Sequence, residues 1–283
     1  MRSGRESPVG DLTSDAVRIA SWNVNSLKAR LPRVEEWLAY ADADVVCLQE
    51  TKLGDAAFPS MAFHALGYES CHFGQGQWNG VAILSRVGID DVVMGLCDVP
   101  DGIAVDEYTA GVLGEARAIT ARCGGVDVVS VYVPNGRAID DPHYAAKLVW
   151  LDRLRSHLAD RATPADPLVV TGDFNIAPTD HDVWDIAKFA TATHVTPAER
   201  NKLEELCGWG LHDVFRRLYP QTGLYTYWDY RAGDFHQHRG MRIDLMLATQ
   251  PMADRVRWSI VDRNARKGKL PSDHAPLIAD FDL

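Results

Sequence analysis

Short apolar segments alternate with amphipathic helical segments along the chain after residue 16, and this alternation limits the folds that the chain can adopt. Strands are predicted over residues 17–22, 45–48, 80–85, 116–122, 126–133, 168–171, 224–227, 243–248 and 276–281. Helices are predicted over residues 31–41, with Pro32 in the first turn, over residues 143–159, and after the capping box of residues 196–199. Many strands with interspersed helices and no linker favour a single layered α/β domain over residues 17–283.

The first 16 residues and the cysteines bear on where the protein works. Residues 1–16 are polar and lack the apolar core of a signal peptide, so we expect a flexible tail. No apolar run approaches the roughly 18 residues that a membrane span needs. The five cysteines are odd in number and include no C-x-x-C pair, which argues against a zinc site or a disulfide framework. We therefore expect small core thiols in a reducing compartment and a cytoplasmic location.

The net charge of −10 argues against nucleic-acid binding, because phosphate neutralisation dominates the affinity of most DNA-binding proteins. Basic residues are unevenly placed, however. Lys28, Arg30 and Arg33 lie close together, and several more basic residues lie between residues 231 and 269. An enzyme needs only transient binding, for which a local basic patch suffices. The acidic balance therefore does not exclude an enzyme that acts on nucleic acid.

Unusual polar residues stand where predicted strands end. They are Asn23, Asn25, Glu50, Tyr132, Asp173, Asn175 and the segment Ser272-Asp273-His274. Each one taken singly is more often a turn or cap residue. Open α/β sheets tend to place their active sites at strand ends, so we expect these side chains to converge. As a set, they are hard to explain as caps.

Asp244 is the most informative of the polar residues because it lies within the apolar strand predicted over residues 243–248. A carboxylate in a buried strand costs several kcal/mol unless it is paired. An imidazole is a natural partner, and His274 is the candidate. Asp173 and Asn175 are two residues apart and therefore share one side of an extended chain.

Seven short motifs resemble those of the exonuclease III family of apurinic/apyrimidinic endonucleases. They are W-N-V-N-S-L-K-A-R (22–30), L-Q-E-T-K (48–52), Y-V-P-N-G (132–136), G-D-F-N-I-A-P (172–178), Y-T-Y-W-D-Y-R (225–231), R-I-D (242–244) and S-D-H-A-P (272–276). The motifs occur in family order from residue 17 to the end. Some are shared with deoxyribonuclease I, sphingomyelinases and inositol polyphosphate phosphatases. The segments 22–30 and 225–231 narrow the resemblance to the DNA-repair branch.

The resemblance implies a fold and an activity. The implied fold is a four-layered α/β sandwich, in which two mixed β-sheets pack face to face with helices on the outside. The implied activity is that of a Mg²⁺-dependent hydrolase, in which Mn²⁺ can substitute for Mg²⁺. Its substrate would be double-stranded DNA, cut 5′ to abasic sites and processed at 3′ ends by exonuclease and phosphatase activities, in base excision repair. A monomer without membrane association is expected.

The resemblance also assigns roles to the metal and the attacking water. Glu50 is the implied principal Mg²⁺ ligand, with Asn23 assisting and Asp273 as a further ligand, in agreement with the oxygen ligands that Mg²⁺ prefers. Asp173 would orient or deprotonate the attacking water, and Asn175 would hold it in place. The identity of the general base stays open.

The remaining catalytic roles concern the phosphate. His274 would donate a hydrogen bond to the scissile phosphate and stabilise its growing negative charge. Asp244 would fix the tautomer of His274 and keep the ring cationic. Tyr132 would donate its phenol hydrogen to the phosphate or to the leaving group.

Substrate choice is implied by a second group of residues. Tyr227, Trp228, Met241 and Ile243 match the family's apolar pocket for a flipped sugar without a base, although Met241 stands where some members have a tryptophan. Ordinary core packing is the alternative for these four. Contacts with DNA are implied for Lys28, Arg30, Asn135, Arg137 and Arg231, and the alternative for the arginines is a plain surface position.

Two other functions are compatible with parts of the sequence. A superfamily relative that acts on a lipid or inositol phosphate would suit the acidic net charge, but the segment 225–231 argues against it. A non-catalytic DNA-binding or scaffold protein could keep the same fold. Every expected catalytic side chain is present, which argues against that alternative.

Overall fold

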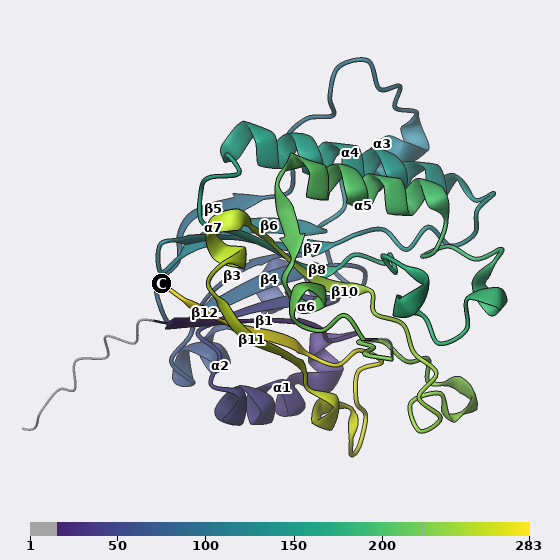
Figure 1. Ribbon diagram of the computed structural model, residues 1–283. Helices are drawn as coiled ribbons and strands as arrows, with labels where there is room; N and C mark the ends of the chain where they lie inside the picture. The colour runs from purple at the N-terminus through teal and green to yellow at the C-terminus, as the bar shows by residue number, and fades with distance from the viewer. Residues whose placement is uncertain (1–15, 222) are drawn as a thin grey trace, which may run out of the picture.

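The computed structural model describes residues 16–221 and 223–283, and these residues form two six-stranded β-sheets packed face to face (Figure 1). In spatial order, the first sheet consists of β11 (Val256–Val261), β12 (Leu277–Asp282), β1 (Ala16–Asn23), β2 (Val45–Gln49), β4 (Val81–Ser85) and β3 (Glu69–Phe73). The second consists of β5 (Asp90–Met94), β6 (Ala118–Cys123), β7 (Val126–Tyr132), β8 (Leu168–Asp173), β10 (Asp244–Thr249) and β9 (Leu211–Asp213). Of the expected tail, only Ala16 is described, and it begins β1; the rest lies outside the described residues.

Both sheets are mixed. β1 pairs with β2 in parallel in the first sheet, and β7 pairs with β8 in parallel in the second. The other neighbouring strands among the described residues are antiparallel. The parallel pairs lie in the interior of the sheets, and the carboxyl ends of their strands reach the same edge of the sandwich.

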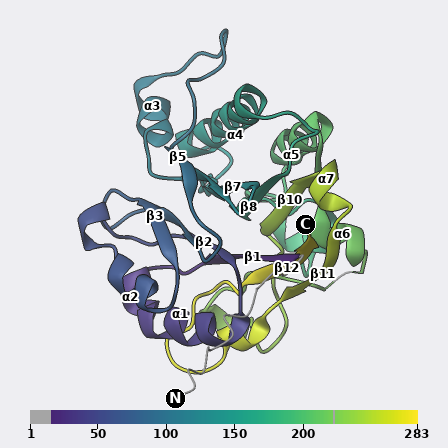
Figure 2. The same ribbon diagram turned by 90° about the vertical axis from the view of Figure 1, so that its left-hand side faces the viewer.

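Helices cover the outer faces of the sheets and complete four layers (Figures 1 and 2). On the first sheet lie α1 (Leu27–Ala41) and α2 (Ser60–Ala65), whereas α3 (Glu107–Leu113), α4 (Pro142–Arg161) and α5 (Pro197–Trp209) lie over the second. The short helices α6 (Val214–Leu218) and α7 (Gln250–Ala253) flank β9 and β10. The expected four-layered α/β sandwich is thereby confirmed.

Alternating side chains of the interior strands build separate cores. Val17 and Ile19 of β1 face the space between the sheets, where they meet residues such as Val128 and Val169 of the second sheet. Ala20 and Trp22 lie on the opposite face of β1 and pack against α1 instead. Both faces of these strands are therefore buried. Burial of each large apolar side chain stabilises the fold by roughly 1.5–3 kcal/mol.

The three predicted helices are present as α1, α4 and α5, whereas α2, α3, α6 and α7 were not predicted. α1 begins at Leu27, four residues earlier than predicted, so Pro32 lies inside the helix and not in its first turn. α5 begins after the predicted capping box, in which the hydroxyl of Thr196 accepts the backbone N–H of Glu199 and the carboxylate of Glu199 accepts the backbone N–H of Thr196. Gly210 ends this helix in a positive-φ conformation.

The strand predicted over residues 224–227 is wrong. The backbone hydrogen bonds of this segment go to two different partners: Tyr227 exchanges them with Met241, while the carbonyl of Thr226 accepts the N–H of Ala275. Tyr227 therefore forms isolated bridges to Met241 and to His274 and belongs to no ladder. The segment therefore connects, through hydrogen bonds, the residues that precede β10 with the residues that precede β12.

Two further features concern the cysteines and the helices. All five cysteines are free, and Cys47 and Cys123 are buried in the core between the sheets. Among the described residues, no helix is both long enough and apolar enough to cross a membrane.

Candidate active site

Polar residues from both sheets meet at one edge of the sandwich. In the second sheet, the register places Asp173 beside Tyr132 on one side and beside Asp244 on the other. In the first sheet, Asn23 ends β1 and Glu50 directly follows β2. The facing sheets bring these ends into contact, since Asn23 Nδ2 donates to Asp173 Oδ2 at 2.9 Å. The predicted convergence is therefore present in the structure.

His274 is buried between two carboxylates. Its Nδ1 lies 2.8 Å from Asp244 Oδ2, and its Nε2 lies 3.8 Å from Asp173 Oδ2. Burial by itself lowers the pKa of this imidazole, but Asp244 and Asp173 raise it, and the result is a pKa of about 10. The ring is therefore a cation at neutral pH, and its Nε2 carries a proton that can be donated. The ring of Tyr227 packs against it, with the ring centroids 4.9 Å apart.

Asp173 is a buried carboxylate that is held at both oxygens. Its Oδ1 accepts the backbone N–H of Asn175 at 2.9 Å, and its Oδ2 accepts the amide of Asn23. Burial raises the pKa of Asp173, the His274 cation lowers it, and the neighbouring carboxylates raise it again, to about 7. A carboxylate with a pKa near neutrality can take up and release a proton, as a general base must.

Glu50 directly follows β2 of the first sheet, in a turn where its φ is 52°. Its Oε1 accepts from Asn23 Nδ2 at 2.9 Å, and its Oε2 lies 2.8 Å from Lys52 Nζ. Burial raises the pKa of Glu50, but Lys52 and the hydrogen bonds outweigh burial and lower it below the usual value. Asp273 lies further out: its Oδ1 accepts from Asn25 Nδ2 at 3.1 Å.

The donor set of this cluster fits a divalent cation. Among the described residues, the buried carboxylates of Asp173 and Asp244 and the half-buried carboxylate of Glu50 face the cations of Lys52 and His274, and a buried charge without a partner is costly. Ligand atoms of Asp173, Asp244 and His274 lie within 4.8 Å of one another, but a protonated imidazole has no free lone pair for a metal. Glu50 and its asparagine neighbour offer the oxygen ligands that Mg²⁺ prefers.

Tyr132 faces a polar cavity of about 390 Å³ beside the carboxylates. The cavity is lined by Trp78, Asn79, Glu115, Arg117, Tyr132, Asn135, Arg137 and His143. The guanidinium of Arg117 lies 4.7 Å from the centre of the Tyr132 ring. Burial and the carboxylate of Glu50 hold the pKa of the Tyr132 hydroxyl well above its usual value, so the hydroxyl stays a hydrogen-bond donor. The predicted residues Asn135 and Arg137 thus share one cavity with Tyr132.

Three of the four predicted pocket residues meet beside His274. Tyr227, Met241 and Ile243 belong to one apolar cluster, in which Tyr227 is half-buried and the other two are almost fully buried. Trp228 does not lie in this cluster. It is fully buried in a different one, because the side chains of adjacent residues in an extended segment point to opposite sides. The expectation that Trp228 lines the pocket is therefore not met.

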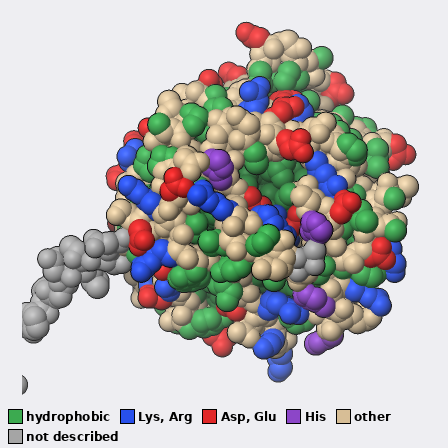
Figure 3. Space-filling view, in the orientation of Figure 1, with side chains coloured by type: hydrophobic (Ala, Val, Ile, Leu, Met, Phe, Trp, Pro, Cys, Tyr) green, Lys and Arg blue, Asp and Glu red, His purple; other side chains and the backbone are tan. Residues whose placement is uncertain are grey.

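The predicted DNA-contact residues outside the cavity differ in exposure and in whether their side chains are paired. Lys28 is exposed on α1. The side chain of Arg231 is 87% exposed and pairs with Asp229 at 2.6 Å. Arg30 is half-buried and donates to the hydroxyl of Tyr230 at 3.1 Å. Figure 3 shows basic side chains interspersed with acidic ones on the face of Figure 1, so the basic residues form no continuous patch there.

A buried network behind Asn175 was not predicted from the sequence. His194 Nε2 lies 3.1 Å from Asn135 Nδ2 and 3.2 Å from Asn175 Oδ1. Lys147 is fully buried, donates to the carbonyl of Asn175 at 2.7 Å and forms an ion pair with Glu199. The capping box that contains Glu199 was the sequence signal nearest to this network, and it indicated only a helix start. The network fixes the segment that follows Asp173.

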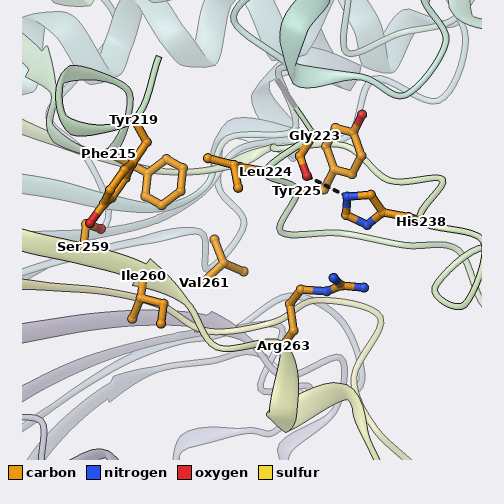
Figure 4. Close-up of a pocket in the computed structure, with 10 residues that line it drawn as sticks. All are labelled: Phe215, Tyr219, Gly223, Leu224, Tyr225, His238, Ser259, Ile260, Val261 and Arg263. Atoms are coloured by element: carbon orange, nitrogen blue, oxygen red, sulfur yellow. Dashed lines mark hydrogen bonds between the residues drawn. The ribbon is translucent and has the colours of Figure 1, made fainter. Parts of the chain in front are cut away.

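An apolar cavity of about 410 Å³ lies between α6 and β11 (Figure 4). Among the described residues that line it, none is a predicted site residue. Figure 4 shows Phe215, Tyr219 and Val261 on its walls, with His238 donating to the carbonyl of Gly223 at 2.7 Å. It lacks a cluster of carboxylates, and the chemistry therefore belongs to the edge where Asp173 and His274 lie.

Two stacked mixed sheets with a carboxylate–histidine cluster at their common edge define a class of metal-dependent phosphohydrolases. The chain matches the model of the Endonuclease/Exonuclease/phosphatase family over residues 20–274, and it belongs to that family. It is 30% identical over 273 residues to the exodeoxyribonuclease III of Haemophilus influenzae, which covers 94% of this chain and 100% of that protein.

Solved structures extend the similarity. The AP endonuclease from Archaeoglobus fulgidus has a TM-score of 0.87 at 36% identity, over 94% of this chain and 100% of that one. The 3′-5′ exonuclease from Neisseria meningitidis has a TM-score of 0.86 at 38% identity, with the same coverage. The resemblance to the exonuclease III family that the motifs indicated is thereby confirmed.

Proposed function

We propose that this protein is a magnesium-dependent DNA-repair nuclease that cuts 5′ to abasic sites and processes 3′ ends as an exonuclease and phosphatase. The observation that carries the proposal is the placement of His274, hydrogen-bonded to Asp244 and 3.8 Å from Asp173, beside the half-buried carboxylate of Glu50. A proton donor, a proton acceptor and a cation ligand are the groups that phosphodiester hydrolysis needs. The similarity to an AP endonuclease and to a 3′-5′ exonuclease supports DNA as the substrate.

Asp173 is assigned to the attacking water. Its pKa near 7 lets it accept a proton at physiological pH. Asn175 holds this carboxylate through its backbone N–H and is itself fixed, because its Nδ2 donates to the carbonyl of Val133 at 2.9 Å. A carboxylate that is held at both oxygens loses little freedom when it orients the water.

His274 and Tyr132 are assigned to the phosphate. His274 donates from Nε2 to a phosphoryl oxygen and stabilises the charge that develops there. Asp244 accepts a hydrogen bond from the Nδ1–H of His274, which fixes the tautomer and keeps the ring cationic. The hydroxyl of Tyr132 donates a second hydrogen bond from the side of the polar cavity.

Glu50 and Asn23 are the residues that would hold Mg²⁺, or Mn²⁺ in its place. Asp273, whose Oδ1 accepts a hydrogen bond from Asn25, would be a further ligand. When bound, the ion supplies charge neutralisation for the phosphoryl and leaving oxygens. Glu50 is suited to this role because its pKa lies below the usual value, so it is ionised at neutral pH.

The apolar cluster of Tyr227, Met241 and Ile243 is proposed to select the substrate. A sugar without a base costs less to extrude from the helix and fits a small pocket that a whole nucleotide does not enter. Arg137, at the rim of the polar cavity, and the exposed Lys28 are proposed to contact the DNA backbone. We propose that the protein works as a monomer in the cytoplasm, where a reducing environment suits five free cysteines.

Three labelled duplexes test the proposal: one with a tetrahydrofuran abasic analogue, one with a 3′-phosphate at a nick and one with a recessed 3′ end. With Mg²⁺, we expect cleavage 5′ to the analogue, release of phosphate and shortening of the 3′ end. Chelation should stop all three, and Glu50→Gln should resemble chelation. Intact DNA in all three assays would contradict the proposal, and faster turnover of an inositol phosphate would favour the other superfamily branch.

Asp244→Asn is expected to move the alkaline limit of activity to lower pH. His274 acts as a cation, so activity is present below its pKa of about 10 and is lost as pH rises through that value. Asp244 makes the largest favourable contribution to that raised pKa, and its neutral replacement lowers the pKa of His274. The measurement is the pH–rate profile on the tetrahydrofuran duplex. An alkaline limb at the same pH in both proteins would contradict the role given to Asp244.

A further inference from the structure

Thr51, His72 and Asp55 form a chain of polar contacts directly behind the turn that carries Glu50. Thr51 Oγ1 lies 2.8 Å from His72 Nε2, and His72 Nδ1 lies 2.8 Å from Asp55 Oδ1. The order resembles the Ser-His-Asp triad of hydrolases. Thr51 is fully buried, however, and a Cβ on Gly80 would lie 2.1 Å from its hydroxyl, so no substrate can reach it. These polar contacts therefore have a purpose other than catalysis.

Chemistry determines the direction of these contacts. The carboxylate of Asp55 only accepts, so Nδ1 of His72 carries the proton, although its N–H is not aligned with the oxygen and the contact is mainly electrostatic. Burial lowers the pKa of His72 by more than Asp55 raises it, so the ring is neutral and its Nε2 accepts a hydrogen bond from the hydroxyl of Thr51. The ring of Phe58 stacks on that of His72 at 4.3 Å and 16°. The imidazole is thus held in one orientation.

The turn itself has a backbone that needs support. Glu50 and Lys52 have φ values of 52° and 53°, in the left-handed region that residues with a Cβ disfavour. Thr51 lies between them. The side chains of Glu50 and Lys52 pair with each other at 2.8 Å on the side of the active site, while that of Thr51 is anchored to His72 in the interior. The Thr51–His72 hydrogen bond is therefore a side-chain anchor between two strained residues.

We propose that Thr51 and His72 are positioning residues that hold Glu50 in the conformation required to bind the divalent cation, with Asp55 orienting His72. This proposal rests on the role proposed for Glu50. Removal of the contacts that support a metal ligand lowers the metal affinity by about 10–100-fold. Without the hydroxyl of Thr51, the strained turn relaxes and Glu50 loses its preset position.

Thr51→Val tests the proposal because it removes the hydroxyl at nearly constant volume. Binding of Mn²⁺ to the full chain without DNA is measured from the electron paramagnetic resonance signal of the free ion. We expect the affinity to fall about tenfold in Thr51→Val and in His72→Leu, and to return in Thr51→Ser, which keeps the hydroxyl.

Thr120→Val is the matched control. Thr120 Oγ1 lies 3.3 Å from His157 Nε2, so it forms a second buried threonine–histidine pair, between β6 and α4. This variant should lower the melting temperature, as Thr51→Val does, and leave the Mn²⁺ affinity unchanged. An equal loss of Mn²⁺ affinity in both threonine variants would overturn the positioning role, because general destabilisation would then explain it.

Glu50→Gln separates the two proposals. If Glu50→Gln loses Mn²⁺ binding while Thr51→Val binds as tightly as the wild type, the positioning role is overturned and the proposed function stands. If the wild type binds Mn²⁺ and Glu50→Gln binds it equally well, Glu50 is not the ligand. The assignment of the metal and the positioning role that rests on it then both fail.

Discussion

Asp173→Asn is expected to lower the rate of DNA incision by about a thousandfold or more, at the upper end of what general-base catalysis contributes, while DNA binding stays largely unchanged. Asparagine has nearly the same size and keeps an oxygen that can accept the N–H of Asn175. It has no proton-accepting carboxylate, so the attacking water is no longer activated. The measurements are single-turnover cleavage of the tetrahydrofuran duplex at saturating Mg²⁺ and DNA affinity by fluorescence anisotropy.

Asp280→Asn serves as the control for that variant. Asp280 is also a buried carboxylate, but it pairs with Arg18 at 2.9 Å near the opposite end of β1. We expect this variant to cleave at the rate of the wild type. If Asp173→Asn keeps more than about a tenth of the wild-type rate with an unchanged melting temperature, the general base is another group.

His274→Ala is expected to lower the incision rate by about 10²–10³-fold, the usual cost of removing one donor to a developing oxyanion. The loss should appear at saturating substrate, because the donated hydrogen bond strengthens as charge develops on the phosphate. His274→Gln should be less damaging, since its amide can donate from nearly the same position without supplying a charge. The measurement is the single-turnover rate of all three proteins.

The ranking of these proteins carries the interpretation. Wild type above glutamine above alanine indicates that both the hydrogen bond and the charge contribute. His157→Ala is a suitable control, because His157 is buried in α4, where it contacts Cys97 and Thr120 and none of the site residues. A loss of less than about tenfold in His274→Ala would remove His274 from the phosphate site.

The interior strands of both sheets could be predicted from the sequence, and the outer strands could not. β3, β5, β9 and β11 were missed, and each is the outermost strand at an edge of its sheet. Interior strands are buried on both faces and appear as continuous apolar runs, as the fully buried β2 and β4 do. Edge strands keep polar residues, as in Asp90–Met94, whose residues are almost all exposed. Hydrophobic pattern alone therefore does not distinguish them from loops.

The site divides in a similar way. Residues at strand ends, such as Asp173 and Asp244, could be predicted because an isolated polar residue in an apolar run is conspicuous and the sheet register then brings the ends together. Supporting residues could not. Lys147 and Glu199 are 52 residues apart, and no sequence pattern links the two. Trp228 was misplaced because its motif does not tell which side of the chain a side chain faces.

An anomalous difference map from a crystal soaked in Mn²⁺ tests the central claim most directly. The claim is that the ends of the two sheets form one phosphodiesterase centre, with the cation on Glu50 and the proton donor on His274. We predict a peak bonded to Glu50, with His274 Nδ1 still hydrogen-bonded to Asp244. A peak bonded to His274, or no peak beside Glu50, would contradict the account.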